Sequence, residues 1–317
     1  MRDLRVALIG GGFMGKAHSM GYGLASVLHD PEVRIHKEVL VEIDEELAER
    51  TARDLGWNSH STNWREVVAR PDIDIVDIVT PPHLHAEIAK AAIAAGKHVF
   101  SEKPITNDAS EADEMWAAAQ AAGVTTQVGY NYRHTPAITL AKRLIERGRI
   151  GRPLQYRSSY LSGGGLTAAP GAMGWRSSKA TGGSGSIGDV GSHILDIAEY
   201  LNGEIVRVSA VARSRKSNQD PEAGYDDESV RLGEDLVENA GFWLAEFANG
   251  SIGMFTTAST SAGRNNQIRF ELDATKGALA FDWNHREELQ VALVDDDPEV
   301  SGFRDVFSSQ KVHENIW

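Results

Sequence analysis

The chain has 317 residues, with 32 lysines and arginines, 45 aspartates and glutamates, and no cysteine. This length is typical of two domains of about 100 to 200 residues each, and the formal net charge of −13 disfavours a large contact with the phosphate backbone of DNA or RNA. The lack of cysteine excludes disulfides, iron–sulfur clusters and cysteine-ligated zinc. The chain starts directly with a strand pattern, and no uncharged apolar run reaches about 18 residues. We therefore expect a cytoplasmic protein without a membrane segment.

Strand and helix patterns alternate over the first 130 residues. The apolar run 4–9 predicts a buried strand, three glycines follow it, and a helical pattern begins near residue 13. A second strand is predicted to end near residues 39–42, and further strands are predicted over 73–80, 98–101 and 124–128. Helices are predicted over 44–55, 83–95 and 109–122. Because parallel neighbours need crossover connections, residues 1–130 are expected to form an α/β domain with a doubly wound parallel sheet.

The pattern changes after a helix predicted over 136–147. Residues 163–188 are rich in Gly, Ser and Ala, and a helix is predicted over 190–201. Strands are predicted over 152–162, 206–213, 242–247, 251–257, 268–274, 278–283 and 289–294. Turn pairs such as Asn249-Gly250 favour antiparallel pairing, so residues 131–317 are expected to form an α+β domain with a large, mostly antiparallel sheet. The polar, charged stretch 214–235 predicts an exposed loop.

Residues 10–15 fit the pattern G-x-G-x-x-G, placed between the first strand and the first helix. In this pattern Gly10 allows a tight turn, Gly12 lets the backbone approach a pyrophosphate, and Gly15 permits close packing of helix against strand. The helix N-terminus would offer amide donors and a positive dipole to the phosphates. A glycine turn without a ligand is the alternative, which the strand–turn–helix context disfavours.

A dinucleotide site also needs a group for the adenosine ribose. Glu42 lies at the predicted end of the second strand, where such an acid is usual, with Asp44 as the substitute. A carboxylate accepts from the ribose 2′-hydroxyl but repels a 2′-phosphate, and no Arg or Lys follows Glu42 before Arg50. The pattern favours NAD over NADP, and a solvated acid at a strand end is the alternative.

Lys103 follows a short predicted strand, in the segment Ser101-Glu102-Lys103-Pro104. The carboxyl edge of a parallel sheet is where ligands bind in open α/β folds, so a lysine there would face the cofactor. A nearby cationic nicotinamide would destabilise the ammonium and suit the lysine to exchanging a proton with a substrate hydroxyl. A surface lysine without a function is the alternative.

Asp189 and His193 lie four residues apart where the glycine-rich run enters a predicted helix, with Asp196 three residues further on. On a helix all three lie near one face. An aspartate that orients a histidine for proton transfer is one use of this pair, and a zinc site is another, although no third ligand is evident nearby. An Asp that caps the helix beside a core histidine is the third possibility.

These segments together resemble the Gfo/Idh/MocA oxidoreductases. The resemblance rests on residues 10–15, Thr80-Pro81-Pro82-His83-Leu84-His85, Gly96-Lys97-His98 leading into Glu102-Lys103-Pro104, 129–133, 148–151, Trp175-Arg176, the glycine run with Asp189 and His193, and Asn249-Gly250. Several stretches are most similar to the branch of the family that oxidises levoglucosan and related sugars. The resemblance implies a Rossmann domain, a second domain whose sheet forms an oligomer interface in many members, and hydride transfer between NAD(P) and a sugar, cyclitol or related polyol.

Carried over by position, the resemblance makes Lys103, Asp189 and His193 the catalytic residues. The expected cofactor site comprises Gly10, Gly12, Phe13, Met14, Gly15, Glu42, Thr80, Pro81, His85, Glu102, Lys103, Asn131, Trp175 and Arg176. The expected substrate site comprises Lys103, Tyr132, Arg176, Asp189 and His193. No metal is expected.

The sequence therefore predicts NAD-dependent oxidation of a secondary hydroxyl of an unphosphorylated sugar, such as a levoglucosan-like pyranose, or of a cyclitol. Lys103 or His193 would take the hydroxyl proton, and Asp189 would hold the imidazole in the useful tautomer. The alternatives are an NADPH-dependent keto-sugar reductase, a family member that keeps and recycles its NAD, and a dinucleotide-binding regulatory protein that is not an enzyme. A homodimer or homotetramer through the second-domain sheet is expected. The resemblance implies that related dehydrogenases run on past the position of Trp317. We therefore expect either that the protein extends beyond Trp317, or that a shortened form has lost part of its substrate pocket and binds sugar poorly while still binding NAD.

Overall fold

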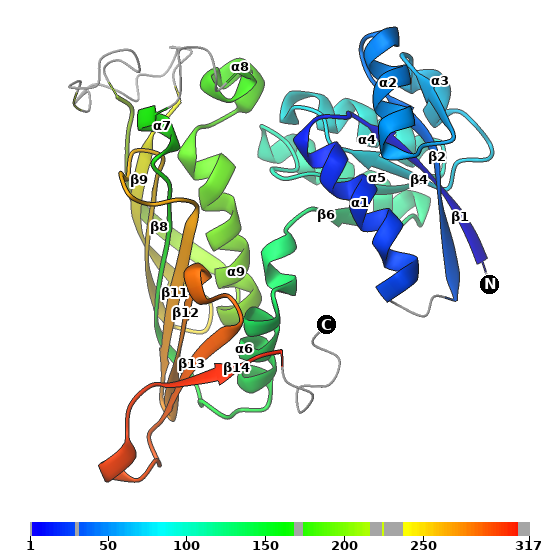
Figure 1. Ribbon diagram of the computed structural model, residues 1–317. Coiled ribbons are helices and arrows are strands. Elements are labelled where there is room, and N and C mark those ends of the chain that lie inside the picture. The colour runs from blue at the N-terminus through cyan, green and yellow to red at the C-terminus, as the bar shows by residue number, and fades with distance from the viewer. Residues whose placement is uncertain (1, 29–31, 168–173, 216–223, 225–236, 310–317) are drawn as a thin grey trace. The chain divides into compact units, whose positions relative to one another are not determined.

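A computed structural model describes residues 2–28, 32–167, 174–215, 224 and 237–309 (Figure 1). The chain divides into two compact units, Met1–Gly129 with Ala180–Gly183, and Tyr130–Lys179 with Ser184–Trp317. The expectations about most of the loop 214–235 and about the chain end at Trp317 lie outside the described residues. No helix within the described ranges is long and apolar enough to cross a membrane.

The first unit contains a six-stranded sheet in the order β3-β2-β1-β4-β5-β6, in which every neighbouring pair is parallel. Its strands are β1 (Arg2–Ile9), β2 (Val33–Val41), β3 (Ser59–Ser61), β4 (Ile75–Ile78), β5 (His98–Ser101) and β6 (Thr126–Val128). Its helices are α1 (Phe13–Leu28), α2 (Glu45–Leu55), α3 (Trp64–Val68), α4 (His85–Ala94) and α5 (Ala109–Ala122), with the 3-10 turn η1 (Pro82–Leu84). The order of the strands reverses between β1 and β4, and such a reversal is where open α/β sheets bind ligands.

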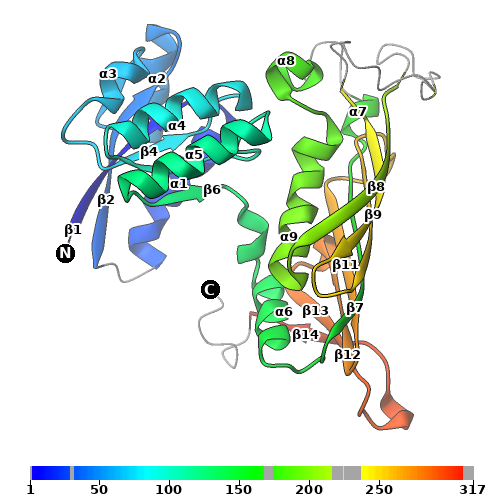
Figure 2. The ribbon, with the colours of Figure 1, turned by 180° about the vertical axis from the view of Figure 1, so that it is seen from behind.

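Helices cover both faces of this sheet, as the predicted doubly wound topology requires. Alternate residues of β1 point to opposite faces, so Ala7 and Ile9 pack in the cluster of α3, α4 and α5, while Val6 and Leu8 pack in the cluster that includes α2. Figure 2 shows α4 and α5 in front of the sheet and α1 behind it. Capping residues set the ends of α2, since Asp44 accepts from the Leu47 amide and Gly56 is left-handed.

The second unit contains an eight-stranded sheet in the order β14-β13-β12-β11-β7-β10-β9-β8. Its strands are β7 (Pro153–Leu161), β8 (Ile205–Arg213), β9 (Ala240–Phe247), β10 (Ile252–Ala258), β11 (Gln267–Ala274), β12 (Gly277–Asp282), β13 (Glu288–Leu293) and β14 (Arg304–Phe307). The β7–β10 pair is parallel and the other pairs are antiparallel, so the sheet is mostly antiparallel, as predicted.

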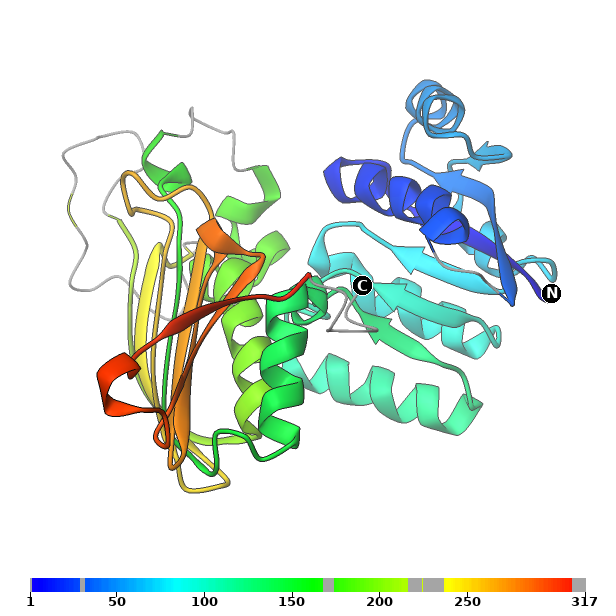
Figure 3. The same ribbon diagram turned by 60° about the horizontal axis from the view of Figure 1, so that its bottom comes forward.

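The remaining elements include two long helices that cover one face of the large sheet. They are η2 (Asn131–His134), α6 (Pro136–Glu146), α7 (Gly164–Thr167), η3 (Gly174–Ser177), α8 (Lys179–Gly182), the π-helical turn η4 (Ile187–Gly191), α9 (Ser192–Asn202), η5 (Trp283–His285) and η6 (Pro298–Val300). Figure 3 shows α6 and α9 lying beside each other on the sheet.

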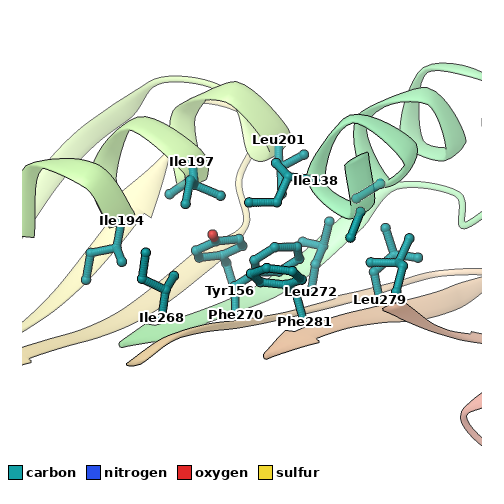
Figure 4. Packing of buried hydrophobic residues seen from close by; sticks show 14 of the residues in the cluster. Ile138, Tyr156, Ile194, Ile197, Leu201, Ile268, Phe270, Leu272, Leu279 and Phe281 are labelled. Carbon is teal, nitrogen blue, oxygen red and sulfur yellow. The ribbon is translucent and has the colours of Figure 1, made fainter. Parts of the chain in front are cut away.

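The core of the second unit lies between these helices and the sheet (Figure 4). Ile138 of α6 and Ile194 of α9 are fully buried above the aromatic rings of the strands. The rings of Tyr156 and Phe270 stack with their centroids 6.0 Å apart. Side chains of this size each contribute about 1.5–3 kcal/mol when fully buried, so α9 is held firmly where it carries His193.

The structure departs from the predicted elements at short or non-local features. β3, α3 and β14 were not predicted, because strands and helices this short lack a readable periodicity. The predicted exposed loop begins too early at residue 214, since Ser214 and Arg215 are 3% and 7% exposed. Asp189 lies in the π-helical turn rather than in the regular helix predicted near it.

Candidate active site

The glycine turn between β1 and α1 has the geometry predicted for its three glycines. Gly10 has a φ of +106°, which side chains rarely permit. A Cβ on Gly15 would collide with the carbonyl oxygen of Gly10, so helix and strand approach this closely only because Gly15 has no side chain. Gly12 is exposed, and a Cβ there would meet nothing within 4 Å. The turn thus presents accessible backbone at the start of α1, where a pyrophosphate would fit.

Three of the predicted cofactor residues lie around the turn. Phe13 is 85% exposed and Met14 is half-buried. Glu42 follows β2 directly, and its Oε1 accepts a 2.6 Å hydrogen bond from the Gly11 amide. Asp44, the substitute candidate, instead accepts from Leu47 at 2.9 Å as the N-cap of α2. Of the two acids, Glu42 is the one that reaches the glycine turn.

The residues predicted to line the nicotinamide follow β4. Thr80 Oγ1 is buried and has no hydrogen-bond partner among the residues that the structure describes, as expected of a hydroxyl that a ligand completes. Pro81 is half-buried next to it. His85 is 1% exposed, and its ring nitrogens lie 2.8 Å from the Thr80 carbonyl oxygen and 3.0 Å from that of Pro104. The ring therefore braces the end of β4 against the loop after β5, and its contact with nicotinamide stays a prediction.

Burial lowers the pKa of His85, although hydrogen bonds to the Thr80 and Pro104 carbonyls act against this shift. A neutral imidazole carries one N–H, so it donates to one of the two carbonyl oxygens at a time. The His85 imidazole that links the two carbonyl groups is therefore neutral.

Lys103 lies two positions beyond β5, at the carboxyl edge of the parallel sheet. Glu102 fixes it there: the Glu102 amide donates to the Ile78 carbonyl at 2.8 Å, and Glu102 Oε2 accepts from the Lys103 amide at 3.1 Å. The Lys103–Pro104 peptide bond is cis, and the Lys103 side chain is half-buried. The lysine thus occupies the edge at which open α/β sheets bind their ligands.

A buried polar cluster joins Glu102 to His18, Tyr22 and Asp77, three residues that were not predicted to belong to the site. Asp77, inside β4, is 0% exposed, and its Oδ2 lies 2.8 Å from His18 Nδ1 and 2.7 Å from the Tyr22 hydroxyl. His18 Nε2 lies 3.2 Å from Glu102 Oε1. The acid in the apolar run Ile75-Val76-Asp77-Ile78 is the signal that could have revealed the cluster, because a buried carboxylate needs partners.

In the second unit the glycine-rich run enters α9 through the turn η4, and Glu238 holds this turn from just before β9. The Glu238 carboxylate accepts from the Gly185 amide at 3.0 Å and from the Ile187 amide at 2.8 Å, and its carbonyl accepts from Ser186. The Asp189 amide donates to the Gly185 carbonyl at 2.9 Å. Glu238 and Gly185 are 53 residues apart, so no local spacing could have predicted this contact.

The turn brings three of the predicted residues together. Arg176 Nε lies 3.7 Å from Asp189 Oδ2, and the Arg176 guanidinium lies 4.2 Å from the centroid of the Trp175 ring. Asp196, on the predicted face of the helix, pairs instead with Arg133, whose Nε lies 3.0 Å from Asp196 Oδ2. Asp196 is therefore engaged in a separate ion pair.

His193, in the first turn of α9, is 7% exposed and surrounded by aromatic rings. The centroids of Tyr132, Tyr130 and Tyr160 lie 4.6, 5.8 and 6.1 Å from that of the imidazole. The rings of Tyr132 and Trp283 also meet edge to face, with their centroids 4.9 Å apart. The predicted substrate residues Tyr132 and His193 are thus neighbours, while Tyr130, Tyr160 and Trp283 were not predicted.

Hydroxyl and amide groups complete this aromatic cluster. The hydroxyls of Tyr132 and Tyr160 lie 3.1 Å apart, and Tyr160 donates a 2.5 Å hydrogen bond to Asn266 Oδ1. Burial and the neighbouring Tyr132 raise the pKa of Tyr160, so its hydroxyl stays neutral.

Asn131 precedes Tyr132 in η2 and is exposed. Its contact with the cofactor stays a prediction. The described residues contain no group of three or more His, Asp or Glu side chains placed to hold a metal ion.

Comparison with known protein families matches both units. Residues 4–130 match the GFO_IDH_MocA oxidoreductase family with an NAD-binding Rossmann fold, and residues 138–280 match the GFO/IDH/MocA C-terminal domain. Levoglucosan dehydrogenase of Pseudarthrobacter phenanthrenivorans is 39% identical over 328 aligned residues, which span 100% of this chain and 84% of the relative. The NAD-dependent scyllo-inositol 2-dehydrogenase of Bacillus subtilis is 33% identical over 73% of this chain and 62% of its own length.

Solved structures agree with these similarities. Levoglucosan dehydrogenase in complex with NADH and levoglucosan superimposes with a TM-score of 0.88 at 38% sequence identity, over 96% of this chain and 80% of that one. An oxidoreductase domain protein from Kribbella flavida superimposes with a TM-score of 0.90 at 37% identity, over 100% of this chain and 83% of that one.

Proposed function

The chain belongs to the Gfo/Idh/MocA family of oxidoreductases, and from this premise we propose that it oxidises a secondary hydroxyl of an unphosphorylated pyranose-type sugar or cyclitol with NAD. Levoglucosan and the inositols are the substrates that the names of its relatives suggest. Because NAD is an intracellular coenzyme, the proposed place of action is the cytoplasm.

The surroundings of His193 carry the proposal about the substrate. The rings of Tyr132 and Trp283 meet edge to face, and such aromatic surfaces suit the C–H faces of a sugar ring. Tyr160 and Asn266 are neutral groups that exchange hydrogen bonds with hydroxyls. A site for a phosphate would need arginine or lysine side chains that can contact the phosphate oxygens. Arg176 is instead paired with Asp189. The described surroundings of His193 thus favour a neutral, unphosphorylated substrate.

The proposed roles follow the placement of each residue. NAD, when bound, supplies the acceptor for the hydride that leaves the substrate carbon. The glycine turn would hold its pyrophosphate, and Glu42 would accept from the adenosine ribose. Lys103 and His193 are the two groups proposed to exchange the hydroxyl proton, and Asp189 is proposed to orient the imidazole.

The experiment is a screen of NAD reduction with levoglucosan, myo-inositol, scyllo-inositol, glucose and xylose. We expect one of these classes to be oxidised, and Lys103→Ala to lose more than nine-tenths of kcat/KM while NAD binding stays within about tenfold, since the glycine turn holds the phosphates. His193→Ala should likewise lower kcat more than NAD affinity, and Asp189→Asn should keep partial activity with an altered pH profile. A Lys103→Ala enzyme that keeps more than a tenth of wild-type kcat/KM would refute the catalytic assignment.

Two further measurements separate the alternatives. Protein that is purified with tightly held NAD, and turns over without added NAD, would be a member that recycles its cofactor. Protein that reduces keto-sugars with NADPH in preference to NADH would be a reductase, contrary to the proposed role of Glu42. Binding of NAD without turnover of any sugar or cyclitol would favour a regulatory protein.

We also propose that a second copy of the chain covers the outer face of β8, β9 and β10. Along β9 the inward side chains are buried, yet the outward Phe242 and Leu244 are also apolar and are 57% and 61% exposed. Met254 and Ile252 of β10 and Val208 of β8 extend this surface, with 53%, 58% and 58% exposure. A contiguous apolar surface on the side of a sheet opposite its helices is typical of an interface between copies.

A further inference from the structure

The cluster formed by His18, Tyr22, Asp77 and Glu102 connects the nucleotide-binding helix to the proposed catalytic lysine. His18 lies on α1, one turn beyond the glycine turn, and its ring stacks on Phe100 of β5 with centroids 5.0 Å apart. Its two ring nitrogens contact carboxylates from two different strands. Asp77 lies inside β4, and Glu102 directly follows β5. From Glu102 a hydrogen bond runs to the Lys103 amide.

The position of the His18 ring between two carboxylates indicates its protonation state. An ionised carboxylate only accepts hydrogen bonds, so an imidazole that satisfies both Asp77 and Glu102 must donate from both nitrogens, and only the imidazolium does so. Tyr22 also donates to Asp77, which favours the ionised form of this carboxylate. Asp77 is 0% and Glu102 is 7% exposed, so neither charge is well solvated without His18.

The titration of His18 agrees with this assignment. Burial acts to lower the pKa of His18, but the hydrogen bonds and charges of Asp77 and Glu102 outweigh it and raise the pKa to about 9. Burial raises the pKa of Asp77, and the bond to His18 acts against that shift. The titratable groups around His18 are Asp77 and Glu102, with Tyr22 beside Asp77 and His85 near Glu102 at the start of α4.

We propose that His18 is a positioning residue, which as an imidazolium bridges Asp77 to Glu102 and thereby holds Lys103 in its working place. Without the bridge, the buried Oε1 of Glu102 loses its donor, and the carboxylate whose Oε2 fixes the Lys103 amide turns or takes up a proton. This inference rests on the proposed role of Lys103 in the reaction.

The test compares four variants with the wild-type protein. His18→Phe keeps an aromatic ring on Phe100 but removes both bonds, while His18→Gln keeps a donor that does not titrate. Tyr22→Phe removes a bond to the same Asp77 carboxylate and leaves the Glu102 contact intact. His36→Gln breaks an exposed pair, in which His36 Nε2 lies 2.8 Å from Asp3 Oδ1, and serves as the control for losing a histidine–carboxylate contact.

We expect His18→Phe to lower kcat roughly tenfold to a hundredfold, the range that a displacement of about 1 Å produces, while the Kd for NAD changes less than about threefold. His18→Gln should restore part of kcat and lose the component of the alkaline decline in kcat near pH 9 that belongs to His18. Tyr22→Phe should lower kcat less than His18→Phe, because it leaves both hydrogen bonds of the His18 ring in place. His36→Gln should stay within about threefold of wild-type kcat. A wild-type kcat in His18→Phe, or a loss matched by Tyr22→Phe, would overturn the proposal.

A second readout does not depend on turnover. In protein labelled with ¹⁵N-histidine, the signals missing from His18→Gln identify His18, and they should show both nitrogens protonated up to about pH 9. A neutral His18 at pH 7 would overturn the bridge even in an active enzyme. If His18 is an imidazolium but no sugar or cyclitol is oxidised, the bridge stands and the proposed function fails.

Discussion

Glu42 is the residue on which the proposed choice between NAD and NADP depends. Its carboxylate is held at the glycine turn by the Gly11 amide, and the next side chain, Ile43, is 92% exposed. A 2′-phosphate brought to this place would meet the negative charge of Glu42, and no Arg or Lys follows Glu42 in the sequence before Arg50. The proposed discrimination against NADP would thus arise from repulsion as much as from a favourable contact with NAD.

The double substitution Glu42→Ser with Ile43→Arg should raise the NADP/NAD ratio of kcat/KM by at least about tenfold, because it removes the repulsion and adds a phosphate partner. Asp44→Asn is the matched control: it changes the acid two positions on, which caps α2, and should leave the ratio unchanged. Steady-state kinetics with both cofactors measures the effect. An unchanged ratio in the double variant would move the ribose role away from Glu42.

His18 also predicts how stability depends on pH. Its pKa is raised in the folded protein from 6.5 to about 9, so its stabilisation is complete below pH 6.5 and is lost as the pH rises through 9. This rise in pKa corresponds to at most about 3.5 kcal/mol. Solvent screens little of it, because the His18 side chain is only 10% exposed. The difference in Tm between wild type and His18→Gln should therefore shrink between pH 7 and pH 10. A constant difference would contradict the prediction.

At the scale of elements, the turn η4 depends on a distant acid. Two amides of the glycine-rich run donate to the Glu238 carboxylate, and Gly185 packs so tightly against the Glu238 backbone that a Cβ there would collide with it. Glu238 thereby holds the π-helical turn in two ways, through hydrogen bonds to its first amides and through close backbone packing at Gly185. Because this turn carries Asp189, its shape decides where the acid of the proposed site lies.

Glu238→Gln should keep one acceptor oxygen and lose the charge-assisted bonds, which are worth about 1.5–3 kcal/mol each. We expect kcat to fall roughly tenfold, with KM for the sugar rising and NAD affinity unchanged, since the glycine turn belongs to the other unit. Glu246→Gln, an exposed acid on the neighbouring strand β9, is the control. Equal kinetics of the two variants would show that the turn does not need Glu238.

The elements that could be predicted from sequence are those with local signals. α2 has an acid cap, an apolar stripe and a left-handed glycine at its end, and the observed helix lies within one residue of the prediction at its start. The loop-borne motifs around Gly10 and Lys103 were identified for the same reason. Three other contacts join residues that are far apart in the chain, so only the folded structure reveals them. They are the contacts of His18 with Asp77 and Glu102, the contact of Glu238 with the glycine-rich run, and the Tyr160–Asn266 pair.

At the scale of the whole molecule, the apolar outer face of β8–β10 predicts association. Light scattering at micromolar concentration should give a dimer or tetramer, because a second copy removes Phe242 and Leu244 from water. Phe242→Glu with Leu244→Glu should shift the mass toward the monomer, whereas Val294→Glu, at a site 75% exposed outside this face, should not. A monomeric wild type would refute the proposed interface.

The parallel pairing of β7 with β10 has a consequence for how the chain is made. β7 is synthesised first among the strands of its sheet but lies between β10 and β11, and Ser158 bonds to Arg269 across 111 residues. At about 5–20 residues per second, the ribosome needs roughly 5–20 s to deliver these partners after β7 has emerged. During that time the aromatic side chains of Tyr156 and Tyr160 have no sheet to enter, so we expect the nascent second unit to expose apolar surface until β10 and β11 have been made.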